Sequence, residues 1–317
     1  LRAAGVPVLE GTATGLAALG HLLAYRDFLA RREGVGNRGT LRAGPASPGD
    51  VDNPPPPSPL SATLPHRGAR HRAGPLDAAR GTGVGARRAS DRWRRRLGDP
   101  GRPLDEAEAL ALLADWGVPV VAAEVATSPE AAQAAARRIG WPVALKTAAP
   151  GVAHKSDVGG VWLGLDGPDR LAAAYADLAD RLGPRALVAA MAGPGVELAL
   201  GVVADPQFGP LLMVAAGGVL VEVLRDRRFA LPPVDHRQAL ALLDRLAVRP
   251  LLDGARGAPP ADLDAVARAV VSLSTLAVDL GPTLAALDVN PLLAGPDGCV
   301  AVDALVVAAS AGPAGSR

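Results

Sequence analysis

The chain has 317 residues, of which 49% are hydrophobic, and its formal net charge at pH 7 is +1. This length allows about two domains with a sizeable apolar core, and the balanced charge gives no indication of a whole-chain affinity for nucleic acid. The single cysteine, Cys299, excludes an internal disulfide framework and is typical of a reducing compartment. The apolar runs are shorter than the roughly 20 residues that a membrane-spanning helix needs, so we expect a cytoplasmic protein.

The first 30 residues have the pattern of the end of an α/β domain. An apolar strand at 6–9 is followed by Gly11 and by a helix at 14–29 with leucines along one side. The chain begins with Leu1 rather than Met. We therefore expect residues 1–30 to be the C-terminal remnant of a domain in a longer protein.

Residues 31–98 have the composition of a flexible linker. They contain 9 Pro and 11 Gly with little apolar periodicity, and 14 Arg against 5 acidic residues give them a charge of +9, which leaves −8 for the rest. The arginines at 87–88 and 92–96 are compatible with polyanion binding, but a solvated linker explains them more simply. The segment 34–39 matches G-x-G-x-x-G, yet it follows no strand and opens no helix, so we do not interpret it as a dinucleotide site.

Regular secondary structure is predicted from residue 104 onwards. Asp105 and Glu108 have the spacing of a capping box that opens a helix, and Gly117 ends it. Apolar patterns and their Gly and Pro punctuation predict strands at 118–125, 142–145, 161–165, 186–191, 197–203, 211–215, 220–224, 285–289 and 299–302, and helices at 129–140, 168–182, 235–247 and 262–280. Neighbouring strands joined by tight turns indicate an α+β fold with largely antiparallel sheets. We expect one domain over 99–308 and a disordered tail over 309–317.

Lysine is almost absent from the chain, which contains 31 Arg and only 2 Lys, Lys146 and Lys155. Arg replaces Lys readily on a solvated surface, whereas a slot built for a compact ammonium does not accept a planar guanidinium. Both lysines lie in one loop region, and Lys146 ends a predicted strand, from which an ammonium reaches nucleotide phosphates. Chance placement is the alternative explanation.

The loop after Lys146 has the residues of a phosphate-handling segment, although the chain contains no G-x-x-x-x-G-K-[ST] motif. Gly151, Gly159 and Gly160 allow backbone N–H groups to approach phosphate oxygens. His154 lies between them, and a neutral imidazole is a phosphoryl acceptor near neutral pH. The alternative is a solvated loop histidine, but its Lys, Asp and Gly neighbours favour a function.

Oxygen-bearing side chains gather at the predicted ends of the last strands. Asp288 and Asn290 share one face by alternation, and the returning strand brings Asp303 beside them. Carboxylate and amide oxygens suit Mg²⁺, which takes one or two carboxylates together with substrate phosphates. The alternative is an ordinary Asx turn before Pro291.

Two further carboxylates, Glu197 and Glu222, lie within apolar strand patterns. A carboxylate buried among apolar residues needs a partner. A nucleoside, a metal ion or an arginine would each supply one.

Taken together, these segments resemble the ATP-grasp domain of ADP-forming acyl-CoA synthetases, relatives of succinyl-CoA synthetase. The matching segments are 143–146, 154–161, 217–223, and 287–292 with 302–303. The resemblance covers about 104–307 and implies two α/β lobes with largely antiparallel sheets. Residues 5–28 are similar to the end of the family's flavodoxin-like CoA-ligase domain.

The resemblance implies a phosphoryl transfer coupled to the reaction acyl-CoA + ADP + phosphate ⇌ carboxylic acid + ATP + CoA. The implied roles are ATP/ADP phosphate binding by Lys146, Ala153 and Lys155, phosphoryl transfer by His154, nucleotide binding by Glu197 and Glu222, and Mg²⁺ binding by Asn290 and Asp303. The family usually carries Gln or Glu where Ala189 stands, a difference that bears on base selectivity and affinity.

The resemblance also implies partners. The CoA-binding domain and most of the CoA-ligase domain are missing from this chain, either as a truncated part or as a separate subunit, so we expect no complete reaction by the chain alone. We also expect an oligomer. The alternative is a non-catalytic or regulatory ATP-grasp module, as in multidomain protein lysine acetyltransferases. Retention of Lys146, His154, Asn290 and Asp303 argues against that alternative. Nucleic acid binding would depend only on the arginines at 87–96.

Overall fold

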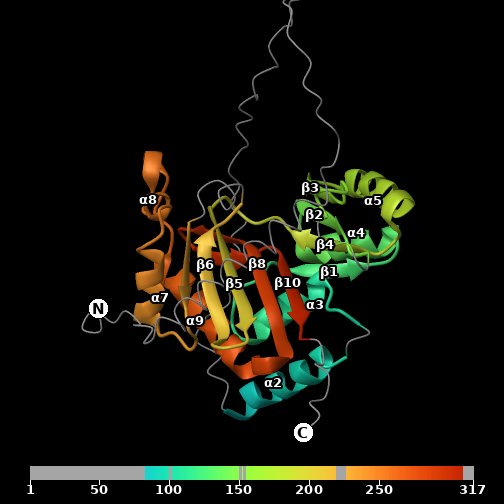
Figure 1. The fold of residues 1–317 in the computed structure, drawn as a ribbon. Helices are drawn as coiled ribbons and strands as arrows, with labels where there is room; N and C mark the ends of the chain where they lie inside the picture. Colours follow the sequence, from blue (N-terminus) through green and yellow to red (C-terminus); the bar gives the residue numbers. More distant parts are fainter. Residues whose placement is uncertain (1–82, 100–101, 150–151, 153–154, 219–225, 310–317) are drawn as a thin grey trace, which may run out of the picture. The chain divides into compact units, whose positions relative to one another are not determined.

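The computed structural model describes residues 83–99, 102–149, 152, 155–218 and 226–309 (Figure 1). The chain divides into two units, Leu1–Pro75 and Leu76–Arg317, and all described residues belong to the second. The expected domain remnant at 1–30, the glycine motif at 34–39 and nearly all of the expected tail lie outside the described residues. Within the described part, no helix has the length and apolarity to cross a membrane.

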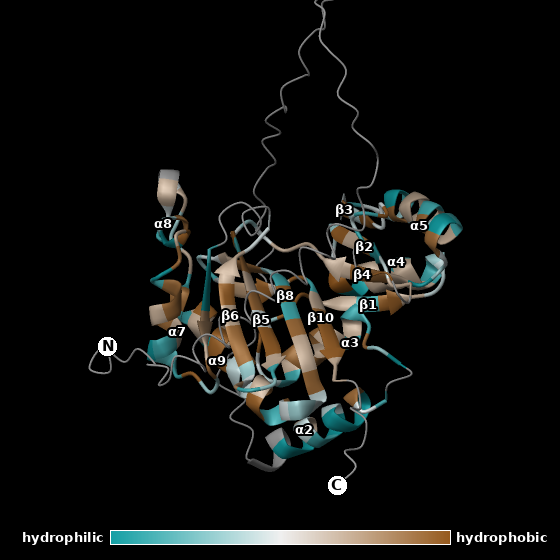
Figure 2. Ribbon diagram, viewed as in Figure 1, coloured by the Kyte–Doolittle hydropathy of each residue, from teal (hydrophilic) through white to brown (hydrophobic). Residues whose placement is uncertain are grey.

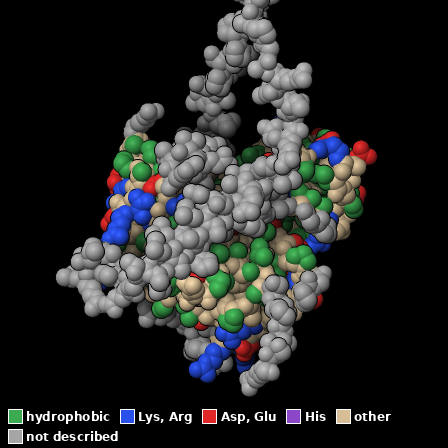
Figure 3. Space-filling model, in the orientation of Figure 1, with side chains coloured by type: hydrophobic (Ala, Val, Ile, Leu, Met, Phe, Trp, Pro, Cys, Tyr) green, Lys and Arg blue, Asp and Glu red, His purple; other side chains and the backbone are tan. Residues whose placement is uncertain are grey.

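Helix α2 (Gly83–Leu97) occupies the end of the segment for which a flexible linker was expected. The expectation is wrong here, because Trp93 and Leu97 are buried in the core and Trp93 Nε1 donates to the Asp115 carboxylate at 2.6 Å. Ser90 Oγ also donates to the Asp279 carbonyl at 3.2 Å. One narrow inward stripe therefore anchors a helix whose other sides are hydrophilic (Figure 2). Its arginines form the basic group at the bottom of the space-filling view (Figure 3).

The next part of the chain forms a four-stranded sheet. Its elements are β1 (Ala123–Ala126), α4 (Pro129–Ile139), β2 (Val143–Thr147), β3 (Val161–Leu165), α5 (Pro168–Leu182) and β4 (Ala186–Ala190). The preceding helix, α3 (Glu106–Asp115), buries its leucines in the larger core of the six-stranded sheet that follows in the chain. The strand order is β1-β4-β2-β3, and every neighbouring pair is antiparallel. Helices α4 and α5 pack on this sheet around a core that includes Leu145, Leu171 and Leu178. Ala189, on β4, is a buried sheet residue with 1% exposure.

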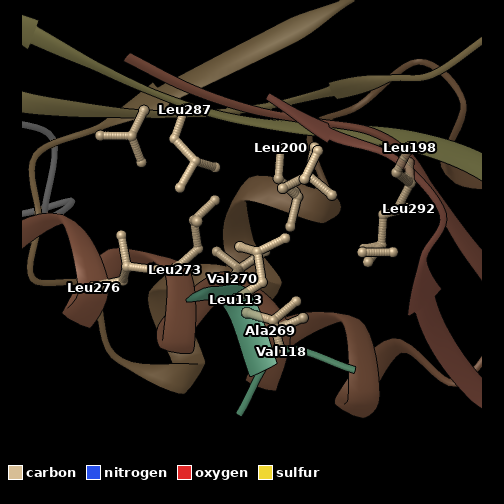
Figure 4. Close-up of a cluster of buried hydrophobic side chains, with 14 of the residues drawn as sticks. Leu113, Val118, Leu198, Leu200, Ala269, Val270, Leu273, Leu276, Leu287 and Leu292 are labelled. Carbon is tan, nitrogen blue, oxygen red and sulfur yellow. The ribbon is translucent and has the colours of Figure 1, made fainter. Parts of the chain in front are cut away.

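The remainder forms a six-stranded antiparallel sheet with its own helices. Its strands are β5 (Val196–Asp205), β6 (Gly209–Ala216), β7 (Arg227–Ala230), β8 (Leu284–Gly295), β9 (Gly298–Ala301) and β10 (Ala304–Ala308), in the order β10-β8-β5-β6-β7 with β9 on β8. Its helices are α7 (His236–Leu243), α8 (Arg249–Leu252) and α9 (Leu263–Leu280). Figure 4 shows leucines of β5 and β8 facing side chains of α9 across the core.

Strand β8 differs from the sequence prediction at the residues that matter most for the site. It was expected to end at Val289, but it continues to Gly295 through a cis Asn290–Pro291 peptide bond. Asn290 N donates to the carbonyl of Asp303, in the connection between β9 and β10, at 3.3 Å, so the backbone of Asn290 stays in the extended ladder. The Asx-turn alternative is therefore wrong. Strand β10, directly after Asp303, was not predicted.

Several other helix and strand boundaries differ from the sequence prediction, but the fold class is the expected one. The strand expected at 118–125 begins only at Ala123, since Val120 makes just an isolated parallel bridge to Ala301. The helix expected at 235–247 ends at Leu243 and is followed by α8. The α+β class with antiparallel sheets is confirmed.

Candidate functional site

Lys146 lies on β2, an inner strand of the four-stranded sheet, where it pairs with Leu187 of β4 and Val161 of β3. Its side chain is 6% exposed. Nζ donates to Oε1 of Glu106 at 2.6 Å and to the Val302 carbonyl at 3.0 Å. An ammonium has three N–H donors, so these two acceptors leave one direction for a further acceptor such as a phosphate oxygen.

Lys155 opens the turn that leads back to β3, and its ammonium lies close to the same carboxylate. Its Nζ is 2.7 Å from Oε2 of Glu106 and 3.6 Å from Oδ2 of Asp303. Burial would lower the pKa of Lys155, but the negative charges of Glu106 and Asp303 outweigh this effect, and the pKa is raised. Both lysines therefore meet at one place, as their rarity in the sequence suggested.

Glu106 was not predicted as a site residue, although it connects the two lysines. It is the first residue of α3, directly after the N-cap Asp105, and its side chain is 3% exposed. Oε2 has the ion pair with Lys155 and no hydrogen bond within the described part of the chain. The capping box engages Asp105 and Glu108 and leaves Glu106 without a capping role. A sequence signal existed, because Glu106 is four residues before the buried Leu110 and therefore lies on the apolar side of the helix.

The turn from Lys155 to Gly160 is folded tightly against β2. Gly160 N donates to the Lys155 carbonyl at 2.7 Å, and Thr147 N donates to the Gly160 carbonyl at 2.8 Å. A Cβ on Gly160 would lie 2.7 Å from Cγ2 of Thr147, so only glycine fits there. Arg181 of α5 donates to the carbonyls of Val158 at 3.2 Å and Gly159 at 3.0 Å. The glycines thus permit a close approach between this turn and the strand that carries Lys146.

One of the oxygen donors expected for Mg²⁺, the Asp303 carboxylate, lies beside the lysines. Oδ2 of Asp303 lies 3.8 Å from Nζ of Lys146, and the backbone of Asp303 is hydrogen-bonded to Asn290. Asp288 and Asn290 are exposed on one face of β8, with the buried Val289 between them. The described residues contain no group of three or more His, Cys, Asp or Glu that would hold a metal ion alone. A carboxylate and an amide fit an ion such as Mg²⁺, which completes its shell with phosphates and water.

The pKa of each of the two carboxylates of this group, Asp303 and Asp288, is raised. Burial raises the pKa of Asp303, the lysines lower it, and the net effect is a rise. Crowding by protein atoms raises the pKa of Asp288 to about 6 even though water reaches its side chain, and the charge of Asp303 adds to the rise. The two carboxylates are therefore close enough to influence each other electrostatically, and Asp303 lies next to two ammonium groups.

Glu197 does not have the buried position that its apolar strand suggested. Its side chain is exposed near the start of β5, so the expectation of a buried carboxylate is wrong. Gly217 N donates to the Glu197 carbonyl at 2.8 Å, and a Cβ on Gly218 (φ +57°) would lie 1.8 Å from Glu197 Oε2. The paired glycines therefore lie directly over this residue. Its carboxylate forms no hydrogen bond or ion pair with the other predicted site residues that are described.

Of the predicted site residues, the structure brings together Lys146, Lys155, Asp303 and the backbone of Asn290. Ala153, His154 and Glu222 lie outside the described residues. Glu106 is the residue that sequence reasoning missed.

Comparison with known proteins matches residues 97–308 to the ATP-grasp domain. The chain is 35% identical over 214 residues to subunit beta of acetate–CoA ligase (ADP-forming) I of Pyrococcus furiosus, covering 65% of this chain and 92% of that relative. It is 38% identical over 204 residues to acetate–CoA ligase (ADP-forming) I of Archaeoglobus fulgidus, covering 62% of this chain but 30% of that longer relative.

A similar solved structure is the dinucleotide-forming acetyl-coenzyme A synthetase 1 of Ca. Korarchaeum cryptofilum, in complex with coenzyme A and Mg-AMPPCP. It has a TM-score of 0.63 and 35% sequence identity, and the match covers 69% of this chain and 99% of that chain. In that structure the phosphohistidine segment points towards the nucleotide binding site. These matches confirm the resemblance drawn from the motifs: the chain belongs to the ATP-grasp domain family, among the ADP-forming acid–CoA ligases.

Proposed function

We propose that this chain is the nucleotide-binding part of an ADP-forming acyl-CoA synthetase and transfers a phosphoryl group between ATP or ADP and His154. The observation that carries the proposal is the convergence of both lysines of the chain on the Asp303 carboxylate, within 3.8 Å. Two ammonium groups beside oxygen donors for a cation are the components that phosphoryl transfer requires.

The lysines would bind the phosphate oxygens of the nucleotide. Lys146 is held by Glu106 and Val302, so its free donor direction is fixed before the nucleotide arrives. Such preorganised charges stabilise the negative charge that spreads over the transferred group in the transition state. Asp303 and Asn290 would hold Mg²⁺, which neutralises charge between adjacent phosphates when bound.

His154 would be the phosphoryl acceptor. The residue after it, Lys155, has its ammonium beside Glu106 and Asp303, which supports a position for the histidine near the same phosphates. A neutral imidazole nitrogen forms the P–N bond while the P–O bond to ADP breaks, and the other ring nitrogen keeps the proton. The phosphohistidine segment of the Korarchaeum relative, which points towards its nucleotide site, supports this assignment.

The remaining chemistry would need partner domains or a partner subunit with CoA-binding and CoA-ligase functions. The Pyrococcus relative is itself a subunit beta, and the Archaeoglobus relative is more than three times longer than the matched region. We propose that the chain acts in such an oligomer in the cytoplasm. Glu197 and Glu222 would contact the nucleotide, and Ala153 would lie beside its phosphates.

Two measurements test the proposal. Titration calorimetry of the 317-residue chain should detect Mg²⁺-dependent binding of ADP, and Lys146→Ala should abolish it. Incubation with γ-labelled ATP and Mg²⁺ should give an acid-labile protein label that His154→Ala lacks and His236→Ala keeps. His236 is a suitable control because it lies on α7 and pairs with Asp264. Unchanged ADP binding in Lys146→Ala, or a label that survives in His154→Ala, would refute it.

A further inference from the structure

One buried carboxylate serves both lysines of the chain. Oε1 of Glu106 accepts from Lys146 at 2.6 Å, and Oε2 lies 2.7 Å from Nζ of Lys155. Lys146 comes from β2 and Lys155 from the turn before β3, so two separate segments are joined through a third, helix α3. Like charges repel, and the two ammonium groups remain together because a carboxylate lies between them.

Glu106 is fixed in this position by the start of α3. The preceding residue, Asp105, is the N-cap and accepts from Glu108 N at 2.9 Å, while Glu108 Oε2 accepts from Asp105 N at 3.3 Å. The positive end of the helix dipole favours a carboxylate in the first turn. With 3% of its side chain exposed, Glu106 has little freedom to turn away.

The other nearby carboxylate does not replace it. Oδ2 of Asp303 is 3.8 Å and 3.6 Å from the two ammonium groups, which is beyond hydrogen-bond distance. In the proposed function Asp303 is also engaged by the cation. Within the described part of the chain, Glu106 is therefore the carboxylate that remains to orient the lysines when a nucleotide and Mg²⁺ are bound.

We infer that Glu106 is a positioning residue of the nucleotide site, which aligns the ammonium groups of Lys146 and Lys155 for the phosphates. The inference rests on the proposed function. It adds a residue that acts through the lysines, because the buried Glu106 carboxylate is paired with both of them. Neutralising Glu106 leaves the site more positive, which maintains attraction for phosphates, but removes the negative charge that pairs with both ammonium groups and holds them in place. We therefore expect nucleotide binding to persist and phosphoryl transfer to slow.

The scarcity of lysine provides a direct readout of this arrangement. The 317-residue chain labelled with [ε-¹³C]lysine should give two side-chain signals, one for each lysine, in NMR spectra without nucleotide. Glu106→Gln should shift both signals together. Glu108→Gln is the matched control, because it alters the same helix, preserves a capping box with Gln at the same position, and touches Arg96 rather than a lysine. It should shift neither signal.

Single-turnover labelling with ATP and Mg²⁺ supplies the kinetic readout. Glu106→Gln should lower the rate constant at saturating ATP at least tenfold, while the ATP concentration for half-maximal rate stays equal or falls. A merely structural residue would lower the folded fraction without this split. Glu106→Asp, which keeps the charge but is too short to span both lysines, provides a second variant should Glu106→Gln fail to fold, and it too should shift at least one lysine signal and slow transfer.

The outcomes separate the inference from the proposed function. Unmoved lysine signals in both Glu106 variants, or an unchanged transfer rate in a folded variant, would overturn the positioning role. A wild-type chain that takes no label refutes the proposed transfer, and the positioning role then depends on the lysine spectra and on retained binding of Mg·ADP by Glu106→Gln.

Discussion

Replacing Lys146 by methionine should destabilise the protein by about 3 kcal/mol. Met has a similar length and no charge, so the substitution removes an ammonium that donates to Glu106 and to the Val302 carbonyl while largely retaining the apolar stem. Removing one partner of a buried ion pair costs about 3–5 kcal/mol. Here Lys155 still neutralises Glu106, which places the ionic loss nearer 2 kcal/mol, and the abandoned carbonyl adds about 1 kcal/mol.

Urea unfolding followed by circular dichroism measures this loss as a shift in midpoint at constant slope. A double-mutant cycle isolates the contribution of the contact between Lys146 and Glu106. Because Lys146→Met and Glu106→Gln remove the same contact, the double variant should cost at least about 1 kcal/mol less than the sum of the single variants. Additive losses, or a single-variant loss below about 1 kcal/mol, would show that the short Lys146–Glu106 contact contributes little, and the reasoning about this cluster would then be wrong.

Three further predictions test neighbouring features. Arg181→Ala, which releases two carbonyls of the turn after Lys155, should slow phosphohistidine labelling several-fold without changing Mg·ADP affinity, whereas Arg170→Ala on the same helix should change neither. Gly218→Ala and Gly209→Ala should each cost about 1–2 kcal/mol in urea unfolding, because both glycines have positive φ. Only Gly218→Ala should also weaken Mg·ADP binding in calorimetry, since its methyl group displaces the carboxylate beneath it. Trp93→Ala should lower the unfolding free energy by about 3 kcal/mol because it empties a core position under α2; a loss near zero would mean that α2 is not anchored.

Helices and strands with clear punctuation were predictable to the residue. Strand Val161–Leu165 and helix Pro168–Leu182 have the bounds expected from the sequence, because glycine precedes the strand, and Pro168 and Gly183 delimit the helix. Helix α2 was not predicted because its apolar, inward-facing stripe is narrow and arginines occupy much of its remaining surface. The sequence prediction ended strand β8 too early because proline normally interrupts a β-ladder. In the structure, the carbonyl of Pro291 accepts a hydrogen bond from Val302 N, so the ladder continues although proline has no N–H to donate.

The site was predictable where a residue type was rare or chemically specific, and not where a local explanation already sufficed. Lys146, Lys155 and Asp303 were found from their chemistry, and the structure places both ammonium groups within 3.8 Å of the Asp303 carboxylate. Glu106 was overlooked because its neighbours form a capping box, which explained the acidic run without it. Its partners are 40 and 49 residues away in the sequence, and no local pattern encodes such a contact.

The geometry also gives a physical reason why these two positions retain lysine in a chain with 31 Arg and 2 Lys. Oxygens from a helix start and from the residue after β9 surround Nζ of Lys146, and they approach it as single acceptors at 2.6 and 3.0 Å. A compact ammonium with three diverging donors satisfies them and retains one donor, whereas a planar guanidinium directs its donors in parallel pairs and needs more space. Lys155 pairs with the same carboxylate, that of Glu106, and only 14% of the Lys155 side chain is exposed. Each position therefore requires a point charge, and the requirement follows from the single carboxylate that both must reach.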